Sequence, residues 1–240
     1  MNAPSAQMHA VLNSVEKENE LKFTISNYRS GPVIKWLKCI CRPDPAYPTG
    51  TVSSIYYDTW DWQSLGEKIN SDYLKKKIRL RWYSDIKHRQ HGPLSFAEAK
   101  FKIGYKRKKV RAKTDLSGAW LSNVDLENAK LQEIPQLLES KGVALNQCYF
   151  PVYLIRYKRH RFIEPRSGLR ICYDSDISVP RVNNIMLPKY NPFTIHTSVF
   201  EFKGNSNEIP YPLHPLLQMG FKKTSFSKYG VCYEKLMGIE

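Results

Sequence analysis

The sequence predicts a mainly β protein of the α+β class, built as an antiparallel eight-stranded barrel with flanking helices. Strand-like runs follow one another along most of the 240 residues, one helical segment interrupts them at 116–142, and charged side chains repeatedly fall on one face of the strands. Consecutive strands of this kind favour an antiparallel sheet that closes on itself. A barrel of about eight strands has an interior that side chains nearly fill, so a charged interior would form a ligand tunnel.

The first part of the chain combines a leader, a strand and a helix. Residues 1–15 have the polar composition of a flexible leader, and a single domain is expected over 16–240. Alternating polar and apolar residues predict a strand over 16–26. Apolar residues at helical spacing predict a helix over 32–41, which ends before Pro43.

The central part carries the strongest strand signals. β-branched and aromatic residues predict a strand over 51–59, and clean alternation predicts another over 75–83. Two further strands, 94–102 and 105–113, join at Gly104 and are expected to form a hairpin.

The remaining part begins with helical spacing and then returns to strands. Leucines predict one or two amphipathic helices within 116–142, broken at Pro135. The rest is expected to comprise strands 149–163, 168–176 and 198–203, a long loop over 178–195, and terminal helices over 213–220 and 227–237.

The net charge gives the first indication of a partner. The chain has 37 Lys and Arg against 22 Asp and Glu, a formal charge of +15. This surplus favours nucleic acid, a phosphate-rich molecule or an anionic membrane surface. The five cysteines form no pair of CxxC units, so we expect reduced thiols in a cytoplasmic protein rather than a zinc site or a disulfide framework. No apolar stretch approaches the length of a membrane span.

Four short runs place two charged residues on one face of a strand, because residues i and i+2 point to the same side of a sheet. They are Glu20-Leu21-Lys22, Arg79-Leu80-Arg81, Glu98-Ala99-Lys100 and Glu201-Phe202-Lys203. Two cations about 4 Å apart repel by roughly 4 kcal/mol at an effective dielectric near 20. A bound polyphosphate would reverse that sign, and a glutamate among the cations fits if it holds Mg²⁺ or Mn²⁺.

Eight sequence runs occur in an order that matches a known family. They are ELKF (20–23), SIYYDT (54–59), KIRLRWY (77–83), FAEAK (96–100), YKRHRF (157–162), LRICYDSDI (169–177), FEFK (200–203) and FSKY (226–229). Together they make the chain resemble the VTC domain, the polyphosphate polymerase module of the triphosphate tunnel metalloenzyme superfamily, as a bacterial-type stand-alone member. The resemblance covers nearly the whole chain from Glu20 onward.

The resemblance implies roles for individual residues. The phosphate-binding set would be Lys22, Arg79, Arg81, Lys100, Arg159, Arg170, Lys203 and Lys228. Within the site, the catalytic residues would be Arg79, Arg81, Arg159 and Glu201. Glu201 and Glu98 would bind the metal, Mn²⁺ or Mg²⁺, and Glu20 shares their spacing. One departure is Ser225, where the family often has a second lysine, and Lys223 could substitute for it.

The implied activity is metal-dependent transfer of the ATP γ-phosphate to a growing inorganic polyphosphate chain. Arg and Lys would neutralise the transferring group, as phosphoryl transfer requires. The alternatives are a hydrolase of tripolyphosphate or nucleoside triphosphates on the same fold, and a non-catalytic polyphosphate-binding sensor. Expected partners are therefore ATP and polyphosphate or tripolyphosphate, with a membrane protein partner for any coupling to transport and no specific nucleic acid.

Two features stay open at this level. The run KRKKVRAK (106–113) could line a tunnel mouth, form a solvated hairpin, or contact lipid or nucleic acid. Asp174 and Asp176 alternate as site residues do, but they could equally pair with Arg170 or its neighbours.

Overall fold

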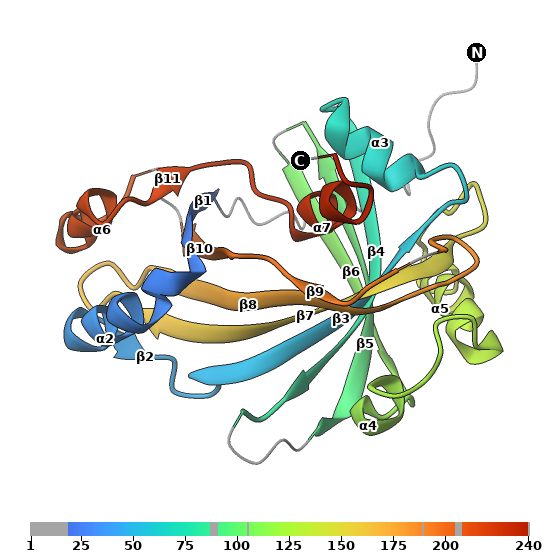
Figure 1. The fold of residues 1–240 in the computed structure, drawn as a ribbon, viewed down its shortest axis with the longest axis horizontal. Coiled ribbons are helices and arrows are strands. Elements are labelled where there is room, and N and C mark those ends of the chain that lie inside the picture. The colour runs from blue at the N-terminus through green and yellow to red at the C-terminus, as the bar shows by residue number, and fades with distance from the viewer. Residues whose placement is uncertain (1–18, 87–90, 105, 189, 205–207, 240) are drawn as a thin grey trace.

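The computed structural model describes residues 19–86, 91–104, 106–188, 190–204 and 208–239 (Figure 1). The predicted leader 1–15 lies outside these residues, as does the start of the first predicted strand. The fold is mainly β, with an antiparallel sheet and flanking helices, which confirms the predicted class.

One sheet organises the described residues. Its main path runs in the order β11 (Lys222–Lys223), β1 (Asn19–Ser26), β10 (Thr197–Gly204), β8 (Arg170–Val182), β7 (Phe150–Ile163), β3 (Thr49–Asp58), β4 (Leu74–Ser84), β5 (His91–Ile103) and β6 (Lys106–Thr114). Two short strands pair off this path, β2 (Arg42–Pro43) with β7 and β9 (Phe193–Thr194) with β8.

Over the described residues the sheet is strongly bent but is not closed by hydrogen bonds. Figure 1 shows β7 and β8 running along the molecule, while β4, β5 and β6 cross them at a steep angle. Among the described residues, β6 and β11 are the two ends of the pairing path. The predicted barrel is therefore an open sheet, and its curvature gives it a concave face.

Alternation along the strands separates an apolar face from a charged face. In β4, Ile78, Leu80 and Trp82 are fully buried, while Arg79 and Arg81 point to the other side. The apolar face of β4 belongs to a core completed by two helices, α4 (Gly118–Leu121) and α5 (Ala129–Glu139). This packing leaves the charged residues on the concave face.

The other helices pack at different places on the sheet. They are η2 (Asn27–Arg29), α2 (Ser30–Ile40), α3 (Gln63–Ile69), η3 (Tyr211–Leu213), α6 (Pro215–Gln218) and α7 (Lys228–Leu236). Leu37 of α2 and Leu216 of α6 share a core with β1, β8 and β10. Tyr229 and Cys232 of α7 pack with Tyr56 and Tyr153 of β3 and β7. Helix α7 thus lies over the sheet and forms part of the concave wall (Figure 1).

The helix α5 continues through Pro135, contrary to the predicted break. A proline has no N–H to donate to the carbonyl four residues earlier, here that of Leu131. The hydroxyl of Tyr57 in β3 donates to this carbonyl at 2.9 Å. A tertiary hydrogen bond therefore replaces the missing helical one.

The strand β8 also extends beyond its predicted end, to Val182 within the predicted loop. Pro180 lies where the register between β7 and β8 shifts, between the pairs at Leu154 and Arg156. Such an irregularity tolerates a residue without an N–H. Helix α3 was not predicted, and the predicted helix 213–220 divides into η3 and α6.

No helix in the described part of the chain is both long and apolar enough to cross a membrane.

Candidate functional site

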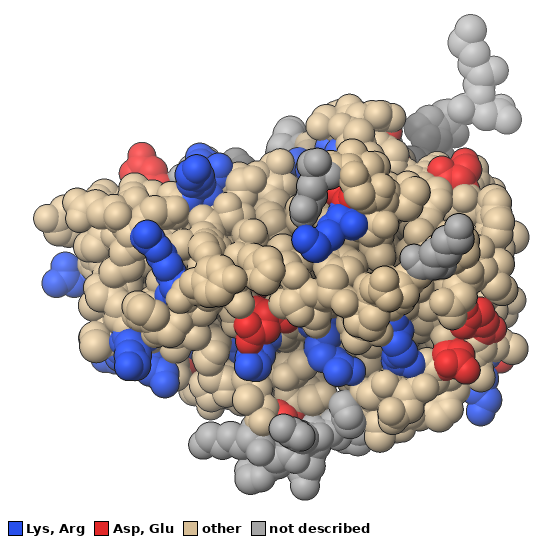
Figure 2. All heavy atoms as spheres, viewed as in Figure 1, with Lys and Arg blue, Asp and Glu red and all other residues tan. Residues whose placement is uncertain are grey.

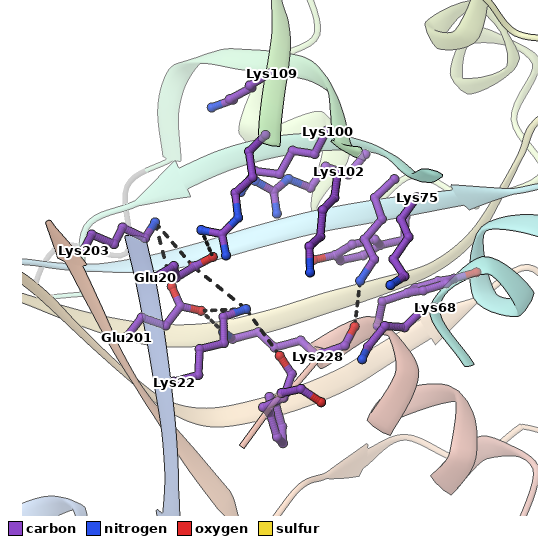
Figure 3. A pocket seen from close by; sticks show the side chains of 18 of the residues that line it. Glu20, Lys22, Lys68, Lys75, Lys100, Lys102, Lys109, Glu201, Lys203 and Lys228 are labelled. Carbon is purple, nitrogen blue, oxygen red and sulfur yellow. Dashed lines mark hydrogen bonds and ion pairs between the residues drawn. The ribbon is translucent and has the colours of Figure 1, made fainter. Parts of the chain in front are cut away.

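The concave face of the sheet borders a cavity of about 1120 Å³ whose lining is dominated by cations (Figure 3). The lining residues come from β1, β3 to β7, β10 and β11, from α3, and from the segment 224–229 that leads into and begins α7. The acidic side chains among the described lining residues are Glu20 and Glu201. On the side of the molecule drawn in Figure 2, Lys and Arg are dispersed among other residues.

Most of the predicted phosphate-binding cations meet in this cavity. The structure places there Lys22, Arg79, Arg81, Lys100, Arg159, Lys203 and Lys228. Arg170 is exposed at the start of β8 and is not among the lining residues, although it pairs in register with Lys203. Both Lys223 and Ser225 line the cavity, so the position without the family's lysine has another lysine beside it.

Glu98 is the centre of a first ion cluster behind the cavity wall. It is fully buried, and Arg79 donates from Nε and Nη2 to its Oε2 at 2.8 and 2.6 Å. Its Oε1 lies 2.6 Å from Lys109 Nζ and 3.3 Å from Arg111 Nε. Burial alone would raise the pKa of Glu98, but Arg79 and Arg81 hold that pKa well below its ordinary value.

This geometry does not fit the predicted role of Glu98 as a metal ligand. Glu98 is fully buried and does not line the cavity, and each of its oxygens has a cationic nitrogen at 2.6 Å. Glu98 instead holds Arg79 in place from behind. Arg81, whose Nη1 lies 4.0 Å from Glu98, is fixed mainly by other groups, since its Nε donates to Ser54 at 3.0 Å and its Nη2 to the Tyr157 hydroxyl at 3.2 Å.

Asp174 and Glu201 form a second ion cluster. Arg159 donates from Nε and Nη2 to the two oxygens of Asp174, at 2.6 and 2.7 Å. Lys228 Nζ lies 2.6 Å from Asp174 and 3.2 Å from Glu201. Burial opposes ionisation of Glu201, yet Lys228, Lys22 and Arg159 hold its pKa well below the usual range. The partner of Asp174 is thus Arg159, and Asp176 pairs with Lys158 at 2.9 Å.

Glu20 and Glu201 are the carboxylates that could hold a metal ion. They lie on adjacent strands β1 and β10, where Glu20 pairs with Lys203 and Glu201 with Lys22. Burial and, to a smaller extent, the charge of Glu201 act to raise the pKa of Glu20, but Lys22 and Lys203 outweigh them and the pKa is lowered. Figure 3 shows the side chains of Glu20 and Glu201 close together on these adjacent strands.

Two neighbouring carboxylates match what Mg²⁺ or Mn²⁺ takes from a protein when phosphate oxygens supply the other ligands. No group of three or more His, Cys, Asp or Glu with metal-site geometry occurs among the described residues. The donor set therefore fits a divalent ion that shares its coordination with a phosphate ligand. The pair that fits is Glu201 with Glu20, in place of the predicted Glu201 with Glu98.

The first turn of α7 is anchored where it meets the cavity. The Ser227 hydroxyl accepts from the backbone N–H of Gly230 and from Lys77 Nζ, the latter at 2.8 Å. The Tyr229 hydroxyl donates to buried Asp58, and the Tyr153 hydroxyl donates to the Tyr229 carbonyl at 2.6 Å. These bonds fix the backbone on both sides of Lys228.

Sequence reasoning missed a group of cavity lysines, Lys68, Lys75, Lys77 and Lys102. Lys75 and Lys77 continue the alternation of Arg79 and Arg81, so their spacing was a usable signal. Lys68 had none, because α3 was not predicted. Arg107, Lys108 and Lys109 of the run 106–113 also line the cavity, while most residues of this run are exposed.

A family model for the VTC domain matches residues 17–237. The chain belongs to the VTC domain family. No curated protein sequence matches it significantly. The family match agrees with the resemblance based on the eight sequence runs. The cavity described above therefore lies in a VTC domain.

Two solved structures are similar to this VTC domain in fold. One is a Hippeastrum protein assigned as an adenylyl cyclase and described as having a dominant triphosphatase activity, with 14% identity and a TM-score of 0.50 over 89% of this chain and 94% of that one. The other is assigned as an adenylate cyclase of Bacillus halodurans, with 13% identity and a TM-score of 0.50 over the same shares. At these identities the likeness concerns the fold alone.

Proposed function

We propose that this VTC domain is a metal-dependent polyphosphate polymerase that transfers the γ-phosphate of ATP to the end of an inorganic polyphosphate chain. The observation that carries the proposal is the convergence of seven predicted cations on one cavity that also contains the neighbouring carboxylates Glu20 and Glu201. Phosphoryl transfer needs positioning and charge neutralisation more than covalent catalysis, and this lining provides both.

The cations are prepared to act on phosphate before a ligand arrives. Glu98 orients Arg79, and Asp174 orients Arg159, each through two short hydrogen bonds. A guanidinium held from behind still presents its remaining N–H group to a phosphate, and little side-chain entropy is lost on binding. Arg79, Arg81 and Arg159 would neutralise the transferring phosphoryl group, while Lys22, Lys203 and Lys228 would hold its neighbours.

Glu201 and Glu20 would hold the divalent ion. Once bound, the ion would neutralise phosphate oxygens and orient the transferring group. Every other contribution comes from the side chains named above.

The nature of the cavity carboxylates favours an anionic acceptor over water. Glu201 is paired with Lys228 at 3.2 Å, and Glu20 with Arg107 at 3.2 Å. A carboxylate held by cations is a weak proton acceptor, whereas activation of water calls for a group that takes a proton. The terminal phosphate of a polyphosphate is already an anion and requires no such group.

The second candidate is hydrolysis of tripolyphosphate or nucleoside triphosphates. It is supported by the dominant triphosphatase activity attributed to the Hippeastrum protein with the same fold. Water would then replace the chain end as the acceptor.

Incubation of the purified chain with ATP and Mn²⁺ separates these activities. Long-chain polyphosphate formed together with ADP supports the polymerase, whereas orthophosphate alone supports the hydrolase and refutes our proposal. Binding of ATP without turnover, in the presence of Mn²⁺ or Mg²⁺, would indicate a polyphosphate sensor. A parallel reaction with EDTA controls for the metal requirement.

A further inference from the structure

A pair of arginines lies outside the cavity, on the opposite face of the sheet. Arg156 follows Leu154 in β7, and Leu154 packs in the core with α4 and α5, so both side chains point away from the cavity. Arg181 of β8 reaches the same face, because its guanidinium donates to the carbonyls of Leu121 and Val124 at and just after the end of α4. Figure 1 shows α4 and α7 on opposite sides of the sheet, and neither arginine lines the cavity.

The backbone of β8 is irregular next to Arg156. On either side of the register pair Arg156–Ser178, β7 advances by two residues while β8 advances by three. Strand β8 therefore carries one extra residue on each side of this pair, and Asp176, in one of the two stretches, has φ of 52°. Such bulges bend a strand and occur often next to active sites, where they re-aim a side chain.

Small hydroxyl side chains flank Arg156 on both neighbouring strands. Its register partners are Ser53 of β3 and Ser178 of β8, so both serines share its face of the sheet. The Ser178 hydroxyl donates to the Arg156 carbonyl at 3.3 Å. Because Arg156 is partly exposed between these small residues, its guanidinium can be reached by a ligand, with the Ser53 hydroxyl as a further donor.

The two arginines share a surface without a neutralising partner for Arg156. Among the described residues, no carboxylate forms an ion pair with Arg156, and burial alone lowers its pKa. Burial also lowers the pKa of Arg181, followed by the charge of Arg156, and Asp125 opposes this shift to a smaller extent. The two guanidiniums are therefore close enough to repel each other, and a bound anion would relieve the repulsion.

The charge and the donors favour a phosphate over a carboxylate. A carboxylate has one charge and two oxygens, which a single guanidinium satisfies through two parallel hydrogen bonds. A phosphate monoester carries a charge of about −1.5 to −2 at pH 7 and three acceptor oxygens. Two guanidiniums beside a hydroxyl match the phosphate in both respects.

We propose that Arg156 and Arg181, with Ser53, form an anion site on the outer face of the sheet that binds a single phosphate monoester group. The site goes beyond the proposed function, because a ligand bound there does not enter the cavity. Arg181 is held by the carbonyls of Leu121 and Val124 and supplies a fixed charge, whereas Arg156 turns its unpaired guanidinium to the ligand.

Calorimetry with phosphoserine tests the site on the variant Arg156→Gln. Arg156 is the residue to change, since Arg181 also holds the carbonyls at the end of α4. The control variant Arg166→Gln removes the same charge from the exposed turn between β7 and β8, outside the cavity. Both variants keep every cavity residue, so any phosphoserine that enters the cavity contributes equally to the three titrations. A parallel titration with tripolyphosphate reports whether the cavity is intact.

At pH 8 we expect a phosphoserine site in the unmodified protein and in the Arg166 variant that Arg156→Gln weakens by at least about tenfold. Arg156→Lys keeps the charge but loses the planar fork, so its loss should be intermediate. Affinity for tripolyphosphate should change by less than about threefold in all variants. In the unmodified protein, binding at the outer site should weaken at pH 5, where the phosphate loses its second charge.

Three outcomes would overturn the outer site. Identical phosphoserine isotherms for the unmodified protein and Arg156→Gln would show that Arg156 binds no phosphate. An equal loss of tripolyphosphate affinity in the Arg156 variant would show that this residue acts through the cavity. Free glutamate that binds the outer site as tightly as phosphoserine does would refute the assignment to phosphate. None of these results bears on the activity proposed for the cavity.

Discussion

Arg159 and Asp174 form a buried two-bond ion pair at the wall of the cavity. The guanidinium Nε and Nη2 donate to separate carboxylate oxygens at 2.6 and 2.7 Å, and the Asp174 side chain is fully buried. Lys228 reaches the same carboxylate at 2.6 Å. One acidic residue that does not line the cavity therefore positions two cations that do.

Asp174→Asn should destabilise the ligand-free protein and should be partly rescued by a phosphate ligand. Removal of one partner from a buried ion pair costs about 3 kcal/mol, because Arg159 and Lys228 lose the charge that compensates them. Tripolyphosphate binds only the folded protein and offers oxygens to the same donors, so it should restore more stability to the variant than to the parent. Urea unfolding with and without tripolyphosphate measures both effects.

Asp176→Asn is the matched control for this experiment. Its partner Lys158 is half exposed, so the pair contributes less than about 1 kcal/mol. Asp176 has φ of 52°, a conformation that asparagine also adopts readily. A loss of stability at Asp174 no larger than that at Asp176 would contradict the structural role given to Asp174.

Glu201→Gln should abolish most turnover while metal-free phosphate binding persists. The change removes a carboxylate proposed to hold the ion, and loss of one such electrostatic contributor lowers turnover by at least about 100-fold. Lys22, Arg159, Lys203 and Lys228 would then have one fewer competing anion, so affinity for tripolyphosphate in EDTA should be equal or higher.

The measurements are product formation with Mn²⁺ and calorimetry in EDTA. Glu133→Gln, an exposed change in α5, serves as the control for charge and handling. Full turnover in the Glu201 variant would show that the metal assignment is wrong.

The strands could be predicted because the residue pattern that indicates a strand lies within a short stretch of sequence. Alternation in 75–83 defines both the strand and its buried face, and β4 and β7 follow the predicted bounds 75–83 and 149–163 closely. The curvature of the sheet and the open ends at β6 and β11 depend on how distant strands pair, and no local pattern encodes this. The prediction of a closed barrel was therefore wrong, although the class and the charged concave face were right.

The sequence locates those site residues whose side chains reach the cavity simply because of their position within a strand. The cations on β1, β4, β5, β7 and β10 converge because alternation places them on one face. Glu98 was predicted as a metal ligand because its spacing matches that of Glu201, whereas in the structure it is buried and forms ion pairs with Lys109 and Arg111 of β6. Arg170 follows the same alternation, yet its place at the end of β8 leaves it exposed and outside the cavity lining.

Tyr57→Phe should destabilise the protein by about 1 to 3 kcal/mol without loss of turnover per folded molecule. The change removes the hydroxyl that donates to the Leu131 carbonyl, which Pro135 leaves without its helical donor. The site lies on the apolar side of the sheet, so the cavity is unaffected.

A double-mutant cycle with Pro135→Ala tests the reason given for this cost. Alanine restores an N–H that can donate to Leu131, so Tyr57→Phe should cost less by about 1 kcal/mol in that background. Urea unfolding of the four proteins gives the interaction free energy. Equal costs in both backgrounds would show that the Tyr57 hydroxyl does not replace the helical hydrogen bond.

Lys77 should take up a proton when a polyanion enters the cavity. Burial, together with the charges of Lys22 and Lys68, lowers its pKa to about 7 in the empty protein, so at pH 8 the amine is mostly neutral. A bound phosphate chain favours the charged form and raises that pKa, and a proton is then taken up between the free and bound values. The groups that face Lys77 are Lys22, Lys68, Lys75, Arg79, Lys100 and Ser227, and none of them is an acid.

Calorimetry at pH 8 in two buffers of different ionisation enthalpy measures this uptake directly. We expect up to one proton fewer to be taken up by Lys77→Gln than by the unmodified protein. At pH 6 the amine is already protonated before binding, so the difference between the two proteins should vanish. The same uptake in both proteins at pH 8 would contradict the assignment, because the proton would then come to another group. A difference that persists at pH 6 would contradict it as well, since the pKa of Lys77 would have to lie lower than the neighbouring lysines and its burial indicate.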